Sequence, residues 1–155
     1  MAICVAFVDD HPILLEGLVS LYSLKKDLSI VAQGHHAVDA IKIAEQHSPD
    51  VIVLDLSMPG DSLAAIDIII KTVTKTKVVI FTATSSIETA VKALNLGVFG
   101  YVLKGSTTLE LHEAIIAAYN GETLYDAGLG NQSHHVDENS RDAAESHAQE
   151  QAECP

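Results

Sequence analysis

The sequence predicts an α/β protein built on a doubly wound, five-stranded parallel sheet. Five short apolar runs of strand length recur between residues 3 and 103. Segments with apolar residues at helical spacing separate them, so strands and helices alternate along the chain. Most of the runs are continuously apolar, which is typical of parallel strands that are buried on both faces. Together these observations predict a parallel sheet with helices packed on both sides.

The first two strands enclose one helix. Ile3–Val8 is apolar throughout and is expected to be a buried strand. From His11 to about Lys25, leucines at positions 14, 18 and 21 share one face of a predicted helix. The run Leu28–Gln33 is shorter and more polar, which indicates a strand near an edge of the sheet.

The middle of the chain repeats the pattern. Ala37–Gln46 is a predicted helix that ends before Ser48 and Pro49. Val51–Asp55 is a continuous apolar strand that closes on an aspartate. After the Pro59-Gly60 break, Leu63–Thr74 is a predicted helix, although its β-branched residues lower helix propensity.

The last two strands each precede a helix with capping residues. Lys77–Thr82 is the fourth predicted strand, and Ser85 with Glu88 resembles a capping box for a helix to about Leu96. Gly97 suits the carboxyl-terminal cap of that helix. Phe99–Leu103 is the fifth strand. A second capping box, Thr107 with Glu110, opens a helix that Gly121 ends.

Right-handed crossovers favour the flavodoxin-like strand order 2-1-3-4-5 for this pattern. Its switch point lies between the first and third strands, where Asp9, Asp10 and Asp55 stand. Two carboxylates about 4 Å apart repel by roughly 4 kcal/mol at an effective dielectric near 20. A hard divalent cation such as Mg²⁺ offsets that repulsion and prefers oxygen ligands. We therefore expect a pocket for Mg²⁺ and phosphate at this edge.

Composition excludes several classes of function. The chain has 9 basic and 21 acidic residues, a net charge of −12, and no arginine before Arg141. Without clustered basic residues, DNA binding by this chain is not expected. No apolar stretch approaches the roughly 20 residues of a membrane span. Two cysteines cannot make a disulfide framework, so we expect a cytoplasmic protein with no membrane partner.

Residues 1–122 are expected to form one domain, and the remainder has a different character. Positions 123–155 are predicted to be a linker and an acidic polar tail. Ser140 suits the cap of a short helix over residues 140–153, whose apolar face would consist of alanines.

Polar residues also follow the fourth and fifth strands, at Thr82 and Lys104. The set Asp9-Asp10, Asp55-Leu56-Ser57-Met58-Pro59-Gly60, Thr82-Ala83 and Lys104, in this order, resembles the receiver domain of two-component response regulators. The resemblance covers about residues 3–121. His11-Pro12 and the segment Gly100–Ser106 are most similar to the NarL/FixJ-type subfamily, whose members carry a LuxR-type output domain.

The resemblance implies a role for each aspartate. Asp55 would be the phosphoryl acceptor. Mg²⁺ would be bound by Asp10 directly, by Asp9 partly through water, by Asp55, and by the backbone carbonyl of Ser57. A sensor histidine kinase would be the phosphoryl donor. The chain would assist its own phosphorylation and dephosphorylation without being a turnover enzyme.

The other matched residues would contact the phosphoryl group or respond to it. Lys104 and Thr82 would contact its oxygens, and Thr82 with Tyr101 would act as the switch. Ser57 and Thr84 would tune dephosphorylation, since they stand two residues beyond the acceptor and the threonine. His11, beside the pocket, is interpreted only as a residue at the start of a helix.

The resemblance leaves alternatives open. The chain would be the amino-terminal part of a transcriptional regulator, with DNA bound only through an output domain that it lacks, and with homodimerisation allowed. Alternatively, it is a stand-alone receiver, or an interaction domain that dimerises without phosphorylation. A haloacid-dehalogenase-like phosphatase needs a second aspartate two residues after its nucleophile. Two residues after Asp10 this chain has Pro12, which argues against that class.

The segment Asp61-Ser62-Leu63 departs from the Asp-Gly turn that is common in the family. The start of the third helix is therefore left open.

Overall fold

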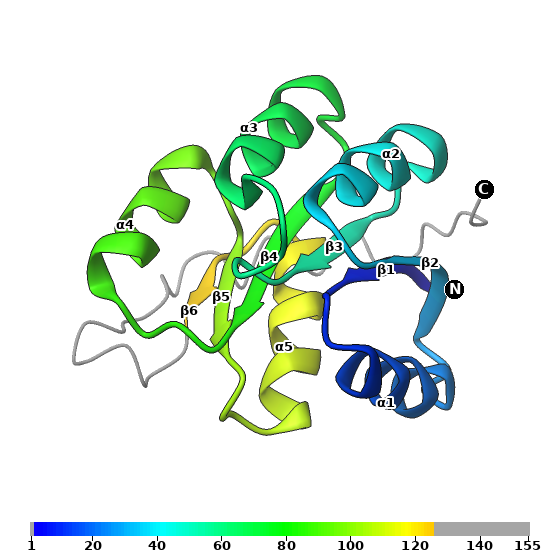
Figure 1. The fold of residues 1–155 in the computed structure, drawn as a ribbon. Helices are drawn as coiled ribbons and strands as arrows, with labels where there is room; N and C mark the ends of the chain where they lie inside the picture. The colour runs from blue at the N-terminus through cyan, green and yellow to red at the C-terminus, as the bar shows by residue number, and fades with distance from the viewer. Residues whose placement is uncertain (1, 126–155) are drawn as a thin grey trace.

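The computed structural model describes residues 2–125, which form a parallel six-stranded sheet between two layers of helices (Figure 1). The strands, in the order of the chain, are β1 Ile3–Val8, β2 Leu28–Gly34, β3 Val51–Leu54, β4 Lys77–Thr82, β5 Gly100–Leu103 and β6 Leu124–Tyr125. The helices are α1 Pro12–Ser23, α2 Ala37–His47, α3 Ser62–Thr72, α4 Ile87–Leu96 and α5 Thr108–Tyr119. In space the strand order is β2-β1-β3-β4-β5-β6.

The flavodoxin-like order of the first five strands is confirmed, but the predicted strand count is wrong by one. The extra strand β6 pairs in parallel with β5, with Leu124 opposite Gly100 and Tyr125 opposite Tyr101. Gly121, with φ of 83°, turns the chain after α5, and the Leu124 amide then donates to the Phe99 carbonyl at 3.1 Å. Two residues are too few to produce a periodic signal, so this segment was expected to belong to the linker. The rest of that linker and the predicted helix 140–153 lie outside the described residues.

The helix starts follow local side-chain caps. Thr107 and Glu110 form the predicted reciprocal capping box of α5, with bonds of 3.1 and 3.2 Å. The predicted box at Ser85 is wrong by one residue, because the Ser86 hydroxyl caps α4 by accepting from the Thr89 amide at 3.2 Å. Asp61 caps α3 through the Ala64 amide at 3.0 Å, which settles the turn that the sequence left open.

The sheet separates two apolar cores. α1 and α5 cover one face, and α2, α3 and α4 cover the other, as Figure 1 shows. Strand residues alternate between the cores, so Ala6 and Val8 face one side while Val5 and Phe7 face the other. Burial on both faces explains why these strands are continuously apolar. In the described part of the chain, no helix is both long and apolar enough to cross a bilayer.

Two tyrosines are buried in these cores. Tyr22 of α1 stacks on Phe7 at 5.7 Å between ring centres and donates its hydroxyl proton to the Thr108 carbonyl at 2.7 Å. Tyr101 of β5 lies in the opposite core, and neither side chain has measurable exposure. Burial disfavours the phenolate, which raises the pKa of each from 10 to about 12.

This burial predicts a loss of stability at alkaline pH. The pKa values of both tyrosines are higher in the folded state than in the unfolded state. Their contribution to the free energy of unfolding is therefore fully present below about pH 10 and falls as the pH rises toward about 12. Urea unfolding at a series of pH values should show a declining free energy over this interval. Tyr22→Phe should make the decline shallower, whereas an equal slope in the variant and the wild type would contradict this assignment.

Candidate functional site

The carboxyl ends of β1 and β3 bring two aspartates side by side. The strands are parallel neighbours with Val8 opposite Leu54, so Asp9 and Asp55 leave the sheet at the same level. The Asp55 amide donates to the Val8 carbonyl at 3.1 Å, which extends the ladder by one bond. Both residues are almost fully buried, with 3% and 1% of their surface exposed. The predicted convergence of these two aspartates is therefore present in the fold.

Lys104 supplies a cation to both buried carboxylates. It follows β5, where its amide donates to the Thr82 carbonyl at 2.8 Å. Its side chain reaches across β4, and Nζ lies 2.9 Å from Asp9 Oδ2 and 3.2 Å from Asp55 Oδ2. Since only 15% of the lysine side chain is exposed, water screens these ion pairs weakly. The lysine thus offsets the repulsion that the aspartates would otherwise have.

His11 belongs to the site, which sequence reasoning missed. Its Nδ1 lies 2.8 Å from Asp9 Oδ1, 3.3 Å from Asp10 Oδ1 and 3.9 Å from Asp55 Oδ2. The His11 amide also donates to Asp9 Oδ1 at 2.9 Å, and Pro12 restricts the backbone before it to an extended conformation. The available signal was its place directly after two acidic residues at a strand end.

The arrangement of side chains fits a divalent cation. Asp9, Asp10, His11 and Asp55 each offer a ligand atom, and these atoms all lie within 4.8 Å of one another. Asp10 Oδ1 is buried and accepts no hydrogen bond, although His11 Nδ1 is close. A buried carboxylate oxygen without a donor is costly unless a cation contacts it. The residues present therefore fit a metal ion.

The loop after β3 lies against the central aspartate. The amide and hydroxyl of Ser57 lie 3.3 and 3.4 Å from Asp55 Oδ1, and both donate to it. The Pro59 carbonyl accepts from the Ala37 amide at 3.2 Å, which holds this loop against the start of α2. The structure thus brings Ser57 to the site through these donors.

Thr82, Thr84 and Tyr101 form a second chain of contacts. The Thr84 amide donates to the Thr82 hydroxyl at 3.5 Å, and the Tyr101 hydroxyl donates to the Thr84 carbonyl at 3.1 Å. Thr82 is buried, and within residues 2–125 no hydrogen bond joins it to Asp55. Thr82 thus lies at the end of β4 with its hydroxyl bonded to Thr84, its contact with a phosphoryl group stays a prediction, and Tyr101 lies inside the core.

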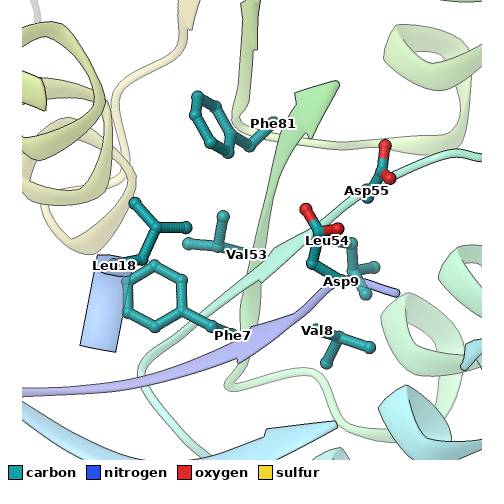
Figure 2. Close-up of a pocket in the computed structure, with 8 residues that line it drawn as sticks. All are labelled: Phe7, Val8, Asp9, Leu18, Val53, Leu54, Asp55 and Phe81. Carbon is teal, nitrogen blue, oxygen red and sulfur yellow. The ribbon is translucent and has the colours of Figure 1, made fainter. Parts of the chain in front are cut away.

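An apolar floor underlies the two buried aspartates (Figure 2). Its lining combines Asp9 and Asp55 with apolar side chains of β1, α1, β3 and β4, namely Phe7, Val8, Leu18, Val53, Leu54 and Phe81. Apolar surroundings lower the local dielectric, so charges at the rim interact more strongly than they would in water. Ion pairs beside this floor are therefore stronger than ion pairs on an open, solvated surface.

One protein family matches most of this chain. The family model described as "Response regulator receiver domain" matches residues 5–116. A curated relative, the response regulator protein VraR of Staphylococcus saprophyticus, is 35% identical over 128 residues, or 82% of this chain and 61% of the relative. The nitrate/nitrite response regulator protein NarL of Escherichia coli is 32% identical over 126 residues, covering 81% of this chain and 58% of that protein. The chain spans about three-fifths of the length of these relatives.

Solved structures agree. A LuxR-family two-component response regulator from Aurantimonas is 33% identical, with a TM-score of 0.74, and the match covers 78% of this chain and 87% of that one. The signal receiver domain of the putative response regulator NarL from Mycobacterium tuberculosis is 30% identical, with a TM-score of 0.73. That match covers 77% of this chain and 98% of that domain. The likeness thus extends over the sheet and the helices that surround the site.

Proposed function

The chain belongs to the response regulator receiver family, of the NarL/LuxR type, and we propose that it accepts a phosphoryl group on Asp55 from a sensor histidine kinase. The observation that carries this proposal is the shared ion pair of Lys104 with Asp9 and Asp55. It places a cation 3.2 Å from Asp55, whose side chain is fully buried, where phosphoryl oxygens would be held.

In the proposed step, an oxygen of Asp55 attacks the phosphorus of a phosphohistidine. The new O–P bond forms as the P–N bond breaks, and the electron pair of that bond stays with the imidazole of the kinase. The Lys104 ammonium, which now pairs with Asp9, would then contact the phosphoryl oxygens. The step depends on positioning and charge stabilisation more than on proton transfer.

Mg²⁺ is the cofactor that we propose for this site. Asp10, Asp9, Asp55 and the Ser57 backbone carbonyl would hold it, and the orphan oxygen of Asp10 supports this choice. When bound, the ion offsets the repulsion between an anionic acceptor and an anionic donor. The described geometry supplies the carboxylate oxygens that a hard cation prefers.

Thr82 and Tyr101 are the proposed switch residues. Phosphorylation adds about −1.5 to −2 charges and three acceptor oxygens beside the end of β4. Thr82 would then exchange its contact with the Thr84 amide for one with the phosphoryl group. Because Tyr101 bonds the Thr84 carbonyl, this exchange would reach β5 and its neighbouring helices. The surface of α4, β5 and α5 is thus the proposed output.

The remaining assignments follow from the relatives. We propose that the chain serves a cytoplasmic transcriptional regulator, that homodimerisation accompanies phosphorylation, and that DNA contact requires a separate output domain. Related solved structures include "two RcsB dimers bound to two parallel DNAs". The chain would be a phosphoacceptor that assists its own reactions, without being a turnover enzyme.

Phosphorylation by a small donor tests the proposal. Purified protein incubated with acetyl phosphate and Mg²⁺ should gain one phosphoryl group by intact-mass analysis, and the adduct should be lost under conditions that hydrolyse acyl phosphates. Omitting Mg²⁺ should greatly reduce the adduct. Failure to form any adduct with Mg²⁺ present would refute the function.

The lifetime of the phosphoryl group is expected to lie toward the short end for receivers. Ser57 and Thr84 are small, and Ser57 is exposed beside Asp55, so water reaches the phosphorus readily. Ser57→Tyr should lengthen the lifetime by shielding that approach. Decay measured after the donor is removed tests this, and persistence of the wild-type adduct for many hours with Mg²⁺ would contradict it.

A further inference from the structure

Strand β6 is a short segment docked at the edge of the sheet, beside β5 (Figure 1). It has two residues, and the Leu124 amide donates to the Phe99 carbonyl at 3.1 Å. The turn before it is tied to α5, because the Glu122 amide donates to the Ala117 carbonyl at 2.8 Å. A two-residue strand opens at little cost, so the packing of its side chains decides how firmly it is docked.

The two side chains of β6 pack against opposite faces of the sheet. Leu124 contacts the core that α1 and α5 cover, and Tyr125 contacts the core that α2, α3 and α4 cover. Tyr125 is half-buried, and this burial raises the pKa of its phenol above the ordinary value. The Tyr125 ring therefore holds β6 to the sheet through apolar packing.

Tyr101 connects this packing with the phosphoacceptor side of the sheet. It is the register partner of Tyr125 in the β5–β6 ladder, and its buried ring belongs to the core that Tyr125 contacts. Its hydroxyl donates to the Thr84 carbonyl at 3.1 Å, and the Thr84 amide donates to the Thr82 hydroxyl at 3.5 Å. A continuous series of contacts thus joins the end of β4 to β6.

We propose that β6 is a latch, that the hydrogen bond of the Tyr101 hydroxyl keeps it docked, and that phosphorylation of Asp55 loosens it. The last part rests on the proposed function. When Thr82 exchanges the Thr84 amide for the phosphoryl group, the loop after β4 loses one of its ties. The Thr84 carbonyl then fixes the Tyr101 hydroxyl less firmly, which weakens the surface on which Tyr125 packs.

The latch gives the phosphorylation signal a second exit from the domain. The polypeptide continues from Tyr125 to Pro155, so β6 is the point at which the following residues are attached to the sheet. This exit is separate from the side chains on the surface of α4, β5 and α5.

Amide hydrogen exchange of the whole chain, followed by NMR, tests whether the Tyr101 hydroxyl holds β6. The Leu124 amide reports docking, because it donates to the Phe99 carbonyl. The amides of β3, in the interior of the sheet, report global unfolding. Tyr101→Phe should lower the protection of Leu124 relative to β3 by at least about threefold. Equal relative protection in the variant and the wild type would overturn the latch.

Tyr22→Phe is the matched control. Tyr22 is also fully buried, and its hydroxyl donates to a backbone carbonyl, that of Thr108, at 2.7 Å. Its ring stacks on Phe7 of β1, which three strands separate from β6. This variant should leave the protection of Leu124 relative to β3 unchanged. A selective loss at Leu124 would show that the effect is not specific to Tyr101 and would count against the inference.

The beryllium trifluoride anion, with Mg²⁺, tests the effect of phosphorylation, because it binds a carboxylate in the shape of a phosphoryl group. Fluorine NMR should detect the bound anion in the wild type and not in Asp55→Asn. With the anion bound, the protection of Leu124 relative to β3 should fall at least about fivefold. Tyr125→Ala should bind the anion like the wild type, but its Leu124 amide should be weakly protected with or without the anion.

The outcomes separate the latch from the proposed function. A bound anion with unchanged or increased protection at Leu124 overturns the loosening and leaves phosphoryl acceptance by Asp55 standing. If no anion binds and acetyl phosphate gives no adduct, the proposed function fails, and the loosening fails with it. Tyr101→Phe, measured without any anion, still decides whether the hydroxyl holds β6 in place.

Discussion

Asp55→Asn is expected to abolish the acid-labile adduct that acetyl phosphate and Mg²⁺ form with the wild-type chain. The substitution replaces a carboxylate with a carboxamide of nearly equal size, so packing at this buried position is preserved. The carboxamide is neutral and a poor nucleophile, and it cannot form the acyl phosphate. It also loses the charge that pairs with Lys104 at 3.2 Å. Intact-mass analysis of parallel reactions measures the difference.

Asp67→Asn provides the control for this experiment. Asp67 is a partly exposed residue of α3 that pairs with Lys71 at 3.1 Å, away from the carboxyl edge of β1 and β3. This variant should be phosphorylated like the wild type. An adduct of undiminished yield on Asp55→Asn would place the acceptor elsewhere and contradict the assignment.

Lys104→Met is expected to lower the free energy of unfolding by about 3 kcal/mol when divalent ions are absent. Two nearly buried carboxylates, Asp9 and Asp55, would lose their common partner, while methionine retains most of the apolar side-chain volume. An uncompensated buried charge is costly because the apolar floor screens it poorly. Urea unfolding in the presence of a chelator measures the loss.

Two further variants test the cause of that loss. Lys75→Met removes a half-exposed lysine that pairs with Asp50 at 3.2 Å, and it should cost no more than about 1 kcal/mol. Adding Asp9→Asn to Lys104→Met should restore part of the stability, since one of the unpaired charges is then removed. Equal effects for the two lysines would show that charge pairing in the pocket is not the cause.

The strands were predictable because their chemistry is local. β1 and β4 have the predicted bounds, since burial on both faces requires an unbroken apolar run and polar residues mark each end. The start of α4 was less predictable, because Ser85 and Ser86 are both suitable caps and the backbone selects the second. Strand β6 was missed because its pairing depends on the path of the chain after Gly121 rather than on its own two residues.

The site was predictable to the extent that strand order determines position. Residues at the ends of β1 and β3 must meet once these strands are neighbours, which is why Asp9 and Asp55 were identified. Side-chain conformations are not determined in this way. The contact of the Thr84 amide with the Thr82 hydroxyl and the position of the His11 ring beside Asp9 depend on local rotamers and hydrogen bonds, which strand order does not specify.

Strand β6 has a consequence for how copies of this protein can associate. An open strand edge attracts strands from other molecules and promotes edge-to-edge aggregation. Here Leu124 and Tyr125 occupy the outer side of β5 at Gly100 and Tyr101, while their side chains pack against the two cores. A second copy therefore cannot add a strand to β5 at these residues. The edge strand on this side is instead β6, whose two residues are too few to template a stable ladder, so self-association through helix side chains is favoured there.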